Sequence, residues 1–267
     1  YDYGIRLPIL NRKVFDIGRV YGYGDVKLGP SWESGDLHPW RENIMRHPHS
    51  VLFFAAEEVA SVEAFEGRDH WVRYEEIDRD VYLYAAYPCE HPIELKDYLV
   101  RKRYPFKPGN VSFDRCPGCG LPIQVASLKW DLEDGTIHDP ESGRRMSFFG
   151  PHAIDAVLHD LRLELGDSIP DLAVEAQRRY VKSRVEGGNW RRGRKTFGDM
   201  TALRGLGNIT RFEADEEHLG VTIQNSCMPL LVIGMAQAIY EIATGREKTS
   251  YAWQQEDDGE LDFDIHA

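Results

Sequence analysis

Cysteine is scarce in this chain, and long hydrophobic runs are missing. Only four cysteines stand among its 267 residues. A secreted module held by disulfides needs more cysteines, more evenly spread, so we expect a reducing, cytoplasmic location. The longest apolar stretch, Met228–Ala238, is interrupted by Pro229 and Gly234. Because a membrane-spanning helix needs roughly 20 apolar residues in a row, we expect no association with a membrane.

Positive charge is also in short supply. Lys and Arg number 32 against 44 Asp and Glu, which gives a formal net charge of −12 at pH 7. Such a field repels nucleic acids unless a local basic face overrides it. One basic segment follows Trp190 and contains Arg191, Arg192, Arg194 and Lys195. It leaves a nucleic-acid-binding zinc ribbon as a disfavoured alternative.

The chain does contain enough apolar material for a globular fold. Hydrophobic residues make up 42% of it and charged residues 28%, which excludes global disorder. At roughly 100–200 residues per domain, the length allows two domains. We place the first at residues 1–143, an N-terminal arm and cysteine region of irregular and β structure. The second, residues 144–267, has the pattern of a compact module.

The N-terminal arm, residues 1–39, is rich in glycine and aromatic residues. This glycine density predicts extended or loop structure. Residues 40–46 predict one or two helical turns, whereas the aromatic and β-branched residues 80–87 predict a strand. Because an arm of this kind cannot bury its rings alone, we expect it to wrap its own subunit or a partner, in a homo- or hetero-oligomer.

Residues 144–267 alternate between helix and strand patterns. Apolar residues spaced three or four apart predict helices over 151–165, 170–184 and 230–244. Alternating residues predict strands over 208–213 and 218–224, and a final hairpin of 250–253 with 261–265. Helices combined with hairpin-connected strands predict a mixed α/β fold of the α+β class.

The pair Cys116-Pro-Gly-Cys119 is the most specific local motif in the chain. Two cysteines three apart around Pro-Gly form a tight turn whose amides point at the sulfurs, so both thiolates converge on one tetrahedral metal. This motif predicts a structural zinc ion. Cys89 and His91, in a proline-bounded turn, are the favoured second pair of ligands, and His138 is the competing ligand.

Two other interpretations of the cysteine pair remain open. A redox dithiol needs a strand before the motif and a helix beginning at it. The residues that follow, 120–128, predict a strand instead, which disfavours redox chemistry. The pair can also be two unligated thiols in a turn.

Several segments of the C-terminal half resemble the 4-vinyl reductase domain family. The segments that carry the resemblance are Arg144–Gly150, the two predicted helices around Leu165-Gly166, Gly205–Glu213, Val221–Cys227, Gly234–Gly245 and Tyr251–Trp253. The resemblance covers a little under half of the chain and implies an α/β module that encloses a small, often aromatic or apolar, ligand. Sensory members of the family look to carry a cysteine-containing zinc site near the end of the domain. Here no cysteine follows Cys227.

The same module has residues suited to a ligand pocket. Gly205, Gly207 and Gly234 permit close backbone approach. Candidate ligand-binding residues, with apolar or polarizable side chains, are Phe212, Cys227, Met228, Met235, Tyr251 and Trp253. Each of them can equally belong to an ordinary hydrophobic core.

The leading hypothesis is therefore a zinc-stabilised protein that binds a small aromatic or hydrophobic molecule. Its expected role is that of an accessory or binding subunit in the catabolism of such compounds. The alternative is an enzyme or catalytic subunit whose site lies between the N-terminal arm and the pocket of the C-terminal module.

Overall fold

The computed structural model describes residues 13–90, 104–184 and 193–267, and in these ranges the fold is mixed α+β. The described residues form two compact units. The first unit takes those within Tyr1–Glu94 and Arg115–Phe149, and the second takes those within Leu95–Asp114 and Gly150–Ala267. The sheets of both units are antiparallel, so the α+β class predicted from the sequence is confirmed.

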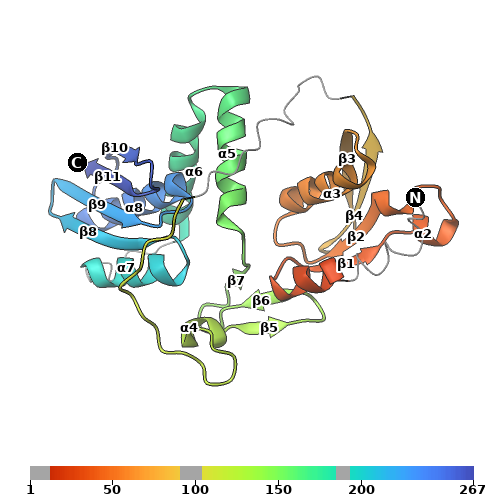
Figure 1. Ribbon diagram of the computed structural model, residues 1–267, viewed down its shortest axis with the longest axis horizontal. Coiled ribbons are helices and arrows are strands. Elements are labelled where there is room, and N and C mark those ends of the chain that lie inside the picture. Colours follow the sequence, from red (N-terminus) through yellow and green to blue (C-terminus); the bar gives the residue numbers. More distant parts are fainter. Residues whose placement is uncertain (1–12, 91–103, 185–192) are drawn as a thin grey trace. The chain divides into compact units, whose positions relative to one another are not determined.

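The first unit is built on a four-stranded sheet with one long helix against it (Figure 1). The strands, in spatial order, are β1 (Asp25–Leu28), β2 (Glu42–Arg46), β4 (Val81–Pro88) and β3 (His70–Asp78). Helix α3 (Val51–Glu66) begins at Ser50, whose hydroxyl accepts from the Phe53 amide, and buries Phe54 against Met45 and Tyr84.

Smaller elements complete the first unit. They are α2 (Ser31–Ser34), the 3₁₀ turn η1 (Pro39–Arg41), α4 (Ile123–Ala126), and a three-stranded sheet of β5 (Lys129–Asp131), β6 (Thr136–His138) and β7 (Arg145–Met146). The guanidinium of Arg145 donates to the carbonyls of Gly22 (3.2 Å) and His47 (2.5 Å), which fastens β7 to the segment before β1 and to the end of β2.

The N-terminal arm is more regular than the sequence predicts. Residues 13–20 are helical, β1 is part of the main sheet, and residues 42–46 form strand β2 after the short turn η1. The predicted helical turns over 40–46 are therefore confined to η1. Strand β2 buries Asn43 and Met45, and its other three residues are half-buried. This alternation of period two extends over only five residues, which is too short to identify a strand from the sequence.

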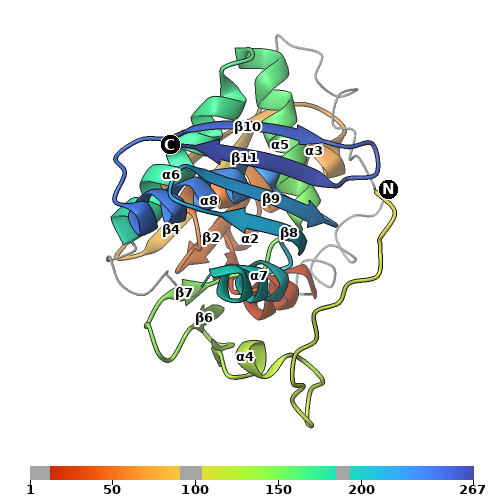
Figure 2. The ribbon, with the colours of Figure 1, turned by 90° about the vertical axis from the view of Figure 1, so that its left-hand side faces the viewer.

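The second unit combines four helices with a four-stranded sheet. Its helices are α5 (Pro151–Leu165), α6 (Ile169–Arg184), α7 (Gly193–Leu203) and α8 (Pro229–Thr244). Its strands, in spatial order, are β10 (Ser250–Gln255), β11 (Leu261–His266), β9 (His218–Gln224) and β8 (Asn208–Ala214). Figure 2 shows these strands side by side with α8 behind them.

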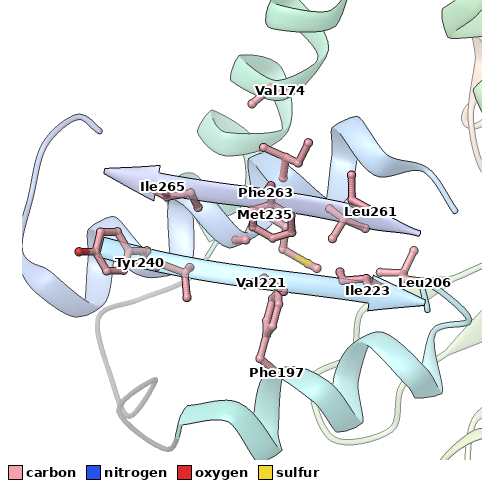
Figure 3. Packing of buried hydrophobic residues seen from close by; sticks show 14 of the residues in the cluster. Val174, Phe197, Leu206, Val221, Ile223, Met235, Tyr240, Leu261, Phe263 and Ile265 are labelled. Atoms are coloured by element: carbon pink, nitrogen blue, oxygen red, sulfur yellow. The ribbon is translucent and has the colours of Figure 1, made fainter. Parts of the chain in front are cut away.

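The core of the second unit lies between this sheet and α8. The strand register aligns Phe212, Val221, Phe263 and Trp253 in one row across the face that packs on α8. Figure 3 shows Met235 beside Val221 and Phe263, with Phe197 reaching the sheet from α7 and Val174 contributed by α6. Val221 and Phe263 are fully buried, and Trp253, on edge strand β10, is 38% exposed.

Helix α6 packs directly against α8 at Gly234. A Cβ atom at this glycine would lie 2.4 Å from the Val174 carbonyl oxygen of α6, closer than real Cβ contacts allow. The close backbone approach expected at Gly234 is therefore present, and it brings the charged face of α6 next to α8. None of the helices in residues 13–90, 104–184 and 193–267 has the length and apolar character that crossing a membrane requires.

Candidate ligand groove and cysteine knuckle

A groove of about 560 Å³ lies on the second unit between α6, α8 and the start of β10. Its lining residues are Asp171, Val174, Glu175, Arg178, Arg179, Gln237, Lys248, Thr249, Ser250 and Tyr251. The volume falls within the range of roughly 300–1,000 Å³ that small-molecule sites occupy. The groove is therefore large enough for a compound of one or two rings.

The wall formed by α6 follows from helical spacing. Asp171, Val174 and Arg178 recur three and four residues apart, so they project from one face of the helix. The Val174 side chain is fully buried in the core below the groove. Asp171 lies in the first turn, where a negative charge complements the helix dipole.

The buried carboxylate of Glu241 on α8 holds polar residues of the groove wall in place. Its Oε1 accepts from the backbone N–H and the hydroxyl of Thr249, both at 2.9 Å, and from Arg178 Nε at 3.3 Å. Its Oε2 pairs with Lys182 Nζ at 2.7 Å. Gln237, one turn earlier on α8, donates to the Thr249 carbonyl at 2.9 Å. These bonds tie α6, α8 and the segment before β10 together.

Tyr251 closes one end of the groove. It lies on the sheet face that packs on α8, opposite Ile265, and its hydroxyl donates to Asp171 Oδ1 at 2.6 Å. Burial, with the hydrogen bond to Asp171 and the nearby acidic charges, raises the pKa of Tyr251 well above its usual value. The phenol therefore stays neutral, and its ring presents an aromatic surface to the groove.

Glu175 is held between two arginines of the same helix. Arg179 Nε lies 2.6 Å from one carboxylate oxygen, and Arg178 Nη1 lies 3.6 Å from the other. The hydrogen bond from Arg179 is the largest cause of the lowered pKa of Glu175, to which the charge of Lys248 also contributes. Glu175 is therefore ionised and paired with these two arginines.

The structure brings the six predicted ligand-binding residues into one unit but gives them different surroundings. Tyr251 lines the groove. Phe212 and Met228 are half-buried against the core, Met235 lies inside it, and Trp253 stands two residues along β10 from Tyr251, on the same sheet face. Whether those other residues contact a ligand stays a prediction.

Cys227 is a buried thiol in this core. Its Sγ donates to the Gly205 carbonyl at 2.8 Å, and burial raises its pKa to about 12. A thiol with so high a pKa carries almost no thiolate at neutral pH, so it has no nucleophilic character. Its contribution is to packing.

The cysteine pair of the first unit has the expected knuckle geometry. The Cys116 amide donates to the Leu121 carbonyl (2.8 Å) and the Gly120 amide to the Cys116 carbonyl (2.9 Å), which closes a tight turn. Hydrogen bonds from the backbone amides of Cys119 and Gly118 to the Cys116 sulfur lower the pKa of that thiol. These are the amide-to-sulfur contacts predicted from the motif.

The other predicted zinc ligands are not gathered around the pair. Cys89 follows β4 and is half-buried, His138 is on β6, and His91 lies outside the described residues. Among residues 13–90, 104–184 and 193–267, no three His, Cys, Asp or Glu side chains are grouped so that they could hold a metal ion. The described residues therefore fit half of a zinc site, two thiols in a knuckle.

The segment after the knuckle differs from the prediction. Instead of a strand, one helical turn, α4, follows Pro122. A turn of four residues is too short to supply the long helix that begins at the cysteines in a redox dithiol motif. The basic segment is only partly described: Trp190, Arg191 and Arg192 lie outside the described residues, and Arg194 and Lys195 fall in the first turn of α7, where side chains are not described.

Comparisons with known proteins give two distant structural likenesses. No protein-family model matches the chain, and no curated protein does. The chain is similar to the phenol-responsive sensory domain of the transcription activator PoxR with phenol, at 11% identity and a TM-score of 0.39, over 54% of this chain and 87% of that one. It is also similar to a Cs H-NOX mutant with 4-cyano-L-phenylalanine at site 5, at 12% identity and a TM-score of 0.32, over 54% and 83%.

Proposed function

We propose that the second unit binds a small aromatic molecule in the groove between α6, α8 and β10. The observation that carries the proposal is a ligand-sized groove beside the ring of Tyr251, in the part of the chain whose segments resemble the 4-vinyl reductase family. The Tyr251 ring supplies apolar contact, and the polar groups of α6 and Thr249 fix orientation. The role that follows is a binding or accessory subunit in the metabolism of aromatic compounds.

The proposal predicts that Tyr251→Ala weakens ligand binding at least tenfold, because it removes the aromatic wall of the groove. Tyr251→Phe keeps the ring and loses only the bond to Asp171, so a change of less than about threefold is expected. Phenols and alkylbenzenes are screened first by tryptophan fluorescence, and each hit is then measured by calorimetry with the full chain.

Tyr180→Ala is the matched control, since Tyr180 is an exposed tyrosine of α6 that does not line the groove. Trp253→Ala and Trp190→Ala locate the site further. Equal losses in Tyr251→Ala and Tyr180→Ala would contradict a site in the groove. Loss of binding in Trp190→Ala alone would move the site to the basic segment.

We also propose that Cys116 and Cys119 hold a structural zinc ion. The amide-to-sulfur hydrogen bonds of the knuckle support this, because they stabilise the thiolate form that binds metal. Cys89 and His91 are the proposed remaining ligands, with His138 as the alternative to one of them. Zinc would cross-link the turn to the rest of the first unit.

Under this proposal, Cys116→Ser should lower the free energy of unfolding by about 2 kcal/mol more than Cys227→Ser does. Losing one of four ligands forfeits binding free energy that is also folding free energy. Cys227→Ser keeps a hydroxyl that can donate to the Gly205 carbonyl. Thermal melts compare the variants, and elemental analysis should find about one zinc per chain. Less than about a tenth of an equivalent would exclude the site.

A further inference from the structure

The charges that line the groove do not cancel. Three lining residues are basic, Arg178, Arg179 and Lys248, and two are acidic, Asp171 and Glu175. The surplus is one positive charge, in a chain whose formal net charge is −12. A local excess of the opposite sign within an acidic protein creates a site that attracts anions.

The surplus charge is carried by Lys248. Arg179 is paired with Glu175, and Arg178 is shared between Glu175 and the buried Glu241. The second carboxylate oxygen of Glu241 is neutralised by Lys182, which does not line the groove.

Asp171 already accepts from Tyr251. Within the part of the chain that the structure describes, the Lys248 side chain has neither a hydrogen bond nor an ion pair, although its field reaches Glu175. Lys248 is therefore the groove cation that is free to bind an incoming group.

We propose that the ligand of this groove is a small aromatic carboxylate, a deepening of the proposed function on which it rests. Its ring packs on Tyr251, and its carboxylate is bound by Lys248. One carboxylate balances a surplus of one positive charge, whereas a phosphate monoester would bring nearly two negative charges beside Asp171 and Glu175. The bond joins two ions, and charge-assisted hydrogen bonds are the stronger kind.

Matched probes test the charge of the ligand. Naphthalene-2-carboxylate and naphthalene-2-carboxamide have nearly the same shape and differ in charge, and each is titrated into the full chain by calorimetry at low and high salt. We expect the carboxylate to bind at least tenfold more tightly than the amide. We also expect this preference to shrink as salt is added, because Lys248 is an exposed residue and salt screens exposed charges.

Variants of Lys248 locate the contact. Lys248→Gln should weaken binding of the carboxylate about tenfold while the amide changes less than twofold, and Lys248→Arg should keep most of the preference. Lys129→Gln, at an exposed lysine of the first unit, is the control and should change neither affinity. Equal affinities of the two probes, or equal losses for both in Lys248→Gln, would overturn the carboxylate assignment alone. Absence of binding for both probes would overturn the proposed function with it.

Discussion

Replacing Glu241 with alanine is expected to lower the free energy of unfolding by about 3 to 5 kcal/mol, the cost of removing one partner from a buried ion pair. The Glu241 side chain is fully buried, and its oxygens engage Thr249, Arg178 and Lys182. Without the carboxylate, the guanidinium of Arg178, which is only 11% exposed, loses its buried partner and keeps the longer ion pair with the partly exposed Glu175, at 3.6 Å. The remaining contacts offset only part of the hydration that this guanidinium loses on burial.

Two further variants separate the causes. Glu241→Gln removes the charge but keeps an oxygen that can accept from Thr249, so an intermediate loss is expected. Glu247→Ala changes an exposed acid of the segment before β10 and should stay within about 0.5 kcal/mol of the wild type. Urea unfolding of the full chain measures the losses, and hydrogen exchange of α6 and α8 locates them. A loss below about 1 kcal/mol in Glu241→Ala would show that the network contributes little to stability.

The second unit was largely predictable from the sequence because its elements are long and have clear ends. Strand β9 has the predicted bounds, and α8 and α6 each begin one residue earlier than predicted. The reasons are local ones: Gly245 ends α8 in the left-handed conformation, at φ 74°, and Pro151 occupies the first turn of α5. Such signals act within a few residues, so they can be recognised without knowledge of the fold.

The first unit was less predictable because its short segments take their conformation from their neighbours. Strand β2 contains Glu42 and Arg46, and its burial of Asn43 and Met45 becomes clear only once β4 and α3 are in place. After the knuckle, the apolar residues 123–126 have no period long enough to distinguish a strand from a helical turn.

The residues of the candidate groove could be predicted from the sequence only in part. The family resemblance predicted Tyr251 as a ligand-binding residue. It did not predict the charged residues of α6, because charges on a helix surface usually face solvent. A usable signal did exist on α8. Gln237 and Glu241 are four residues apart on one face of an otherwise apolar helix, and both are buried. Buried polar groups require partners, so this pair indicated a polar wall nearby.

A pH-dependent stability is expected from Glu58 in the first unit. This carboxyl is buried on α3, and both of its oxygens accept from Asn43 Nδ2, at 2.9 and 2.8 Å. Glu58 also lies near Tyr84 of β4, and its charge contributes to the raised pKa of that tyrosine. Burial raises the pKa of Glu58 from 4.5 to about 7, against the opposing effect of the Asn43 hydrogen bond.

The sign of the effect follows from linkage. Because the folded protein holds the Glu58 proton more tightly than the unfolded chain does, the stabilising contribution is complete below pH 4.5 and is lost as the pH rises through about 7. A difference between 4.5 and 7 corresponds to about 3 kcal/mol, at 1.36 kcal/mol per pKa unit. Glu58→Gln cannot ionise. The difference in unfolding free energy between this variant and the wild type should therefore shift in favour of the variant by about 2 to 3 kcal/mol from pH 5 to pH 8.

Urea unfolding of the wild type and Glu58→Gln at pH 5, 6, 7 and 8 measures this difference. Glu33→Gln, at an exposed acid of α2, is the control and should follow the wild-type profile. The Asn43 Oδ1 atom is buried without a hydrogen-bond partner among the described residues, and a protonated Glu58 can supply the missing donor once the amide and acid groups align. Parallel pH profiles for the wild type and Glu58→Gln would mean that Glu58 is ionised in the fold across this range, and that Asn43 alone compensates its burial.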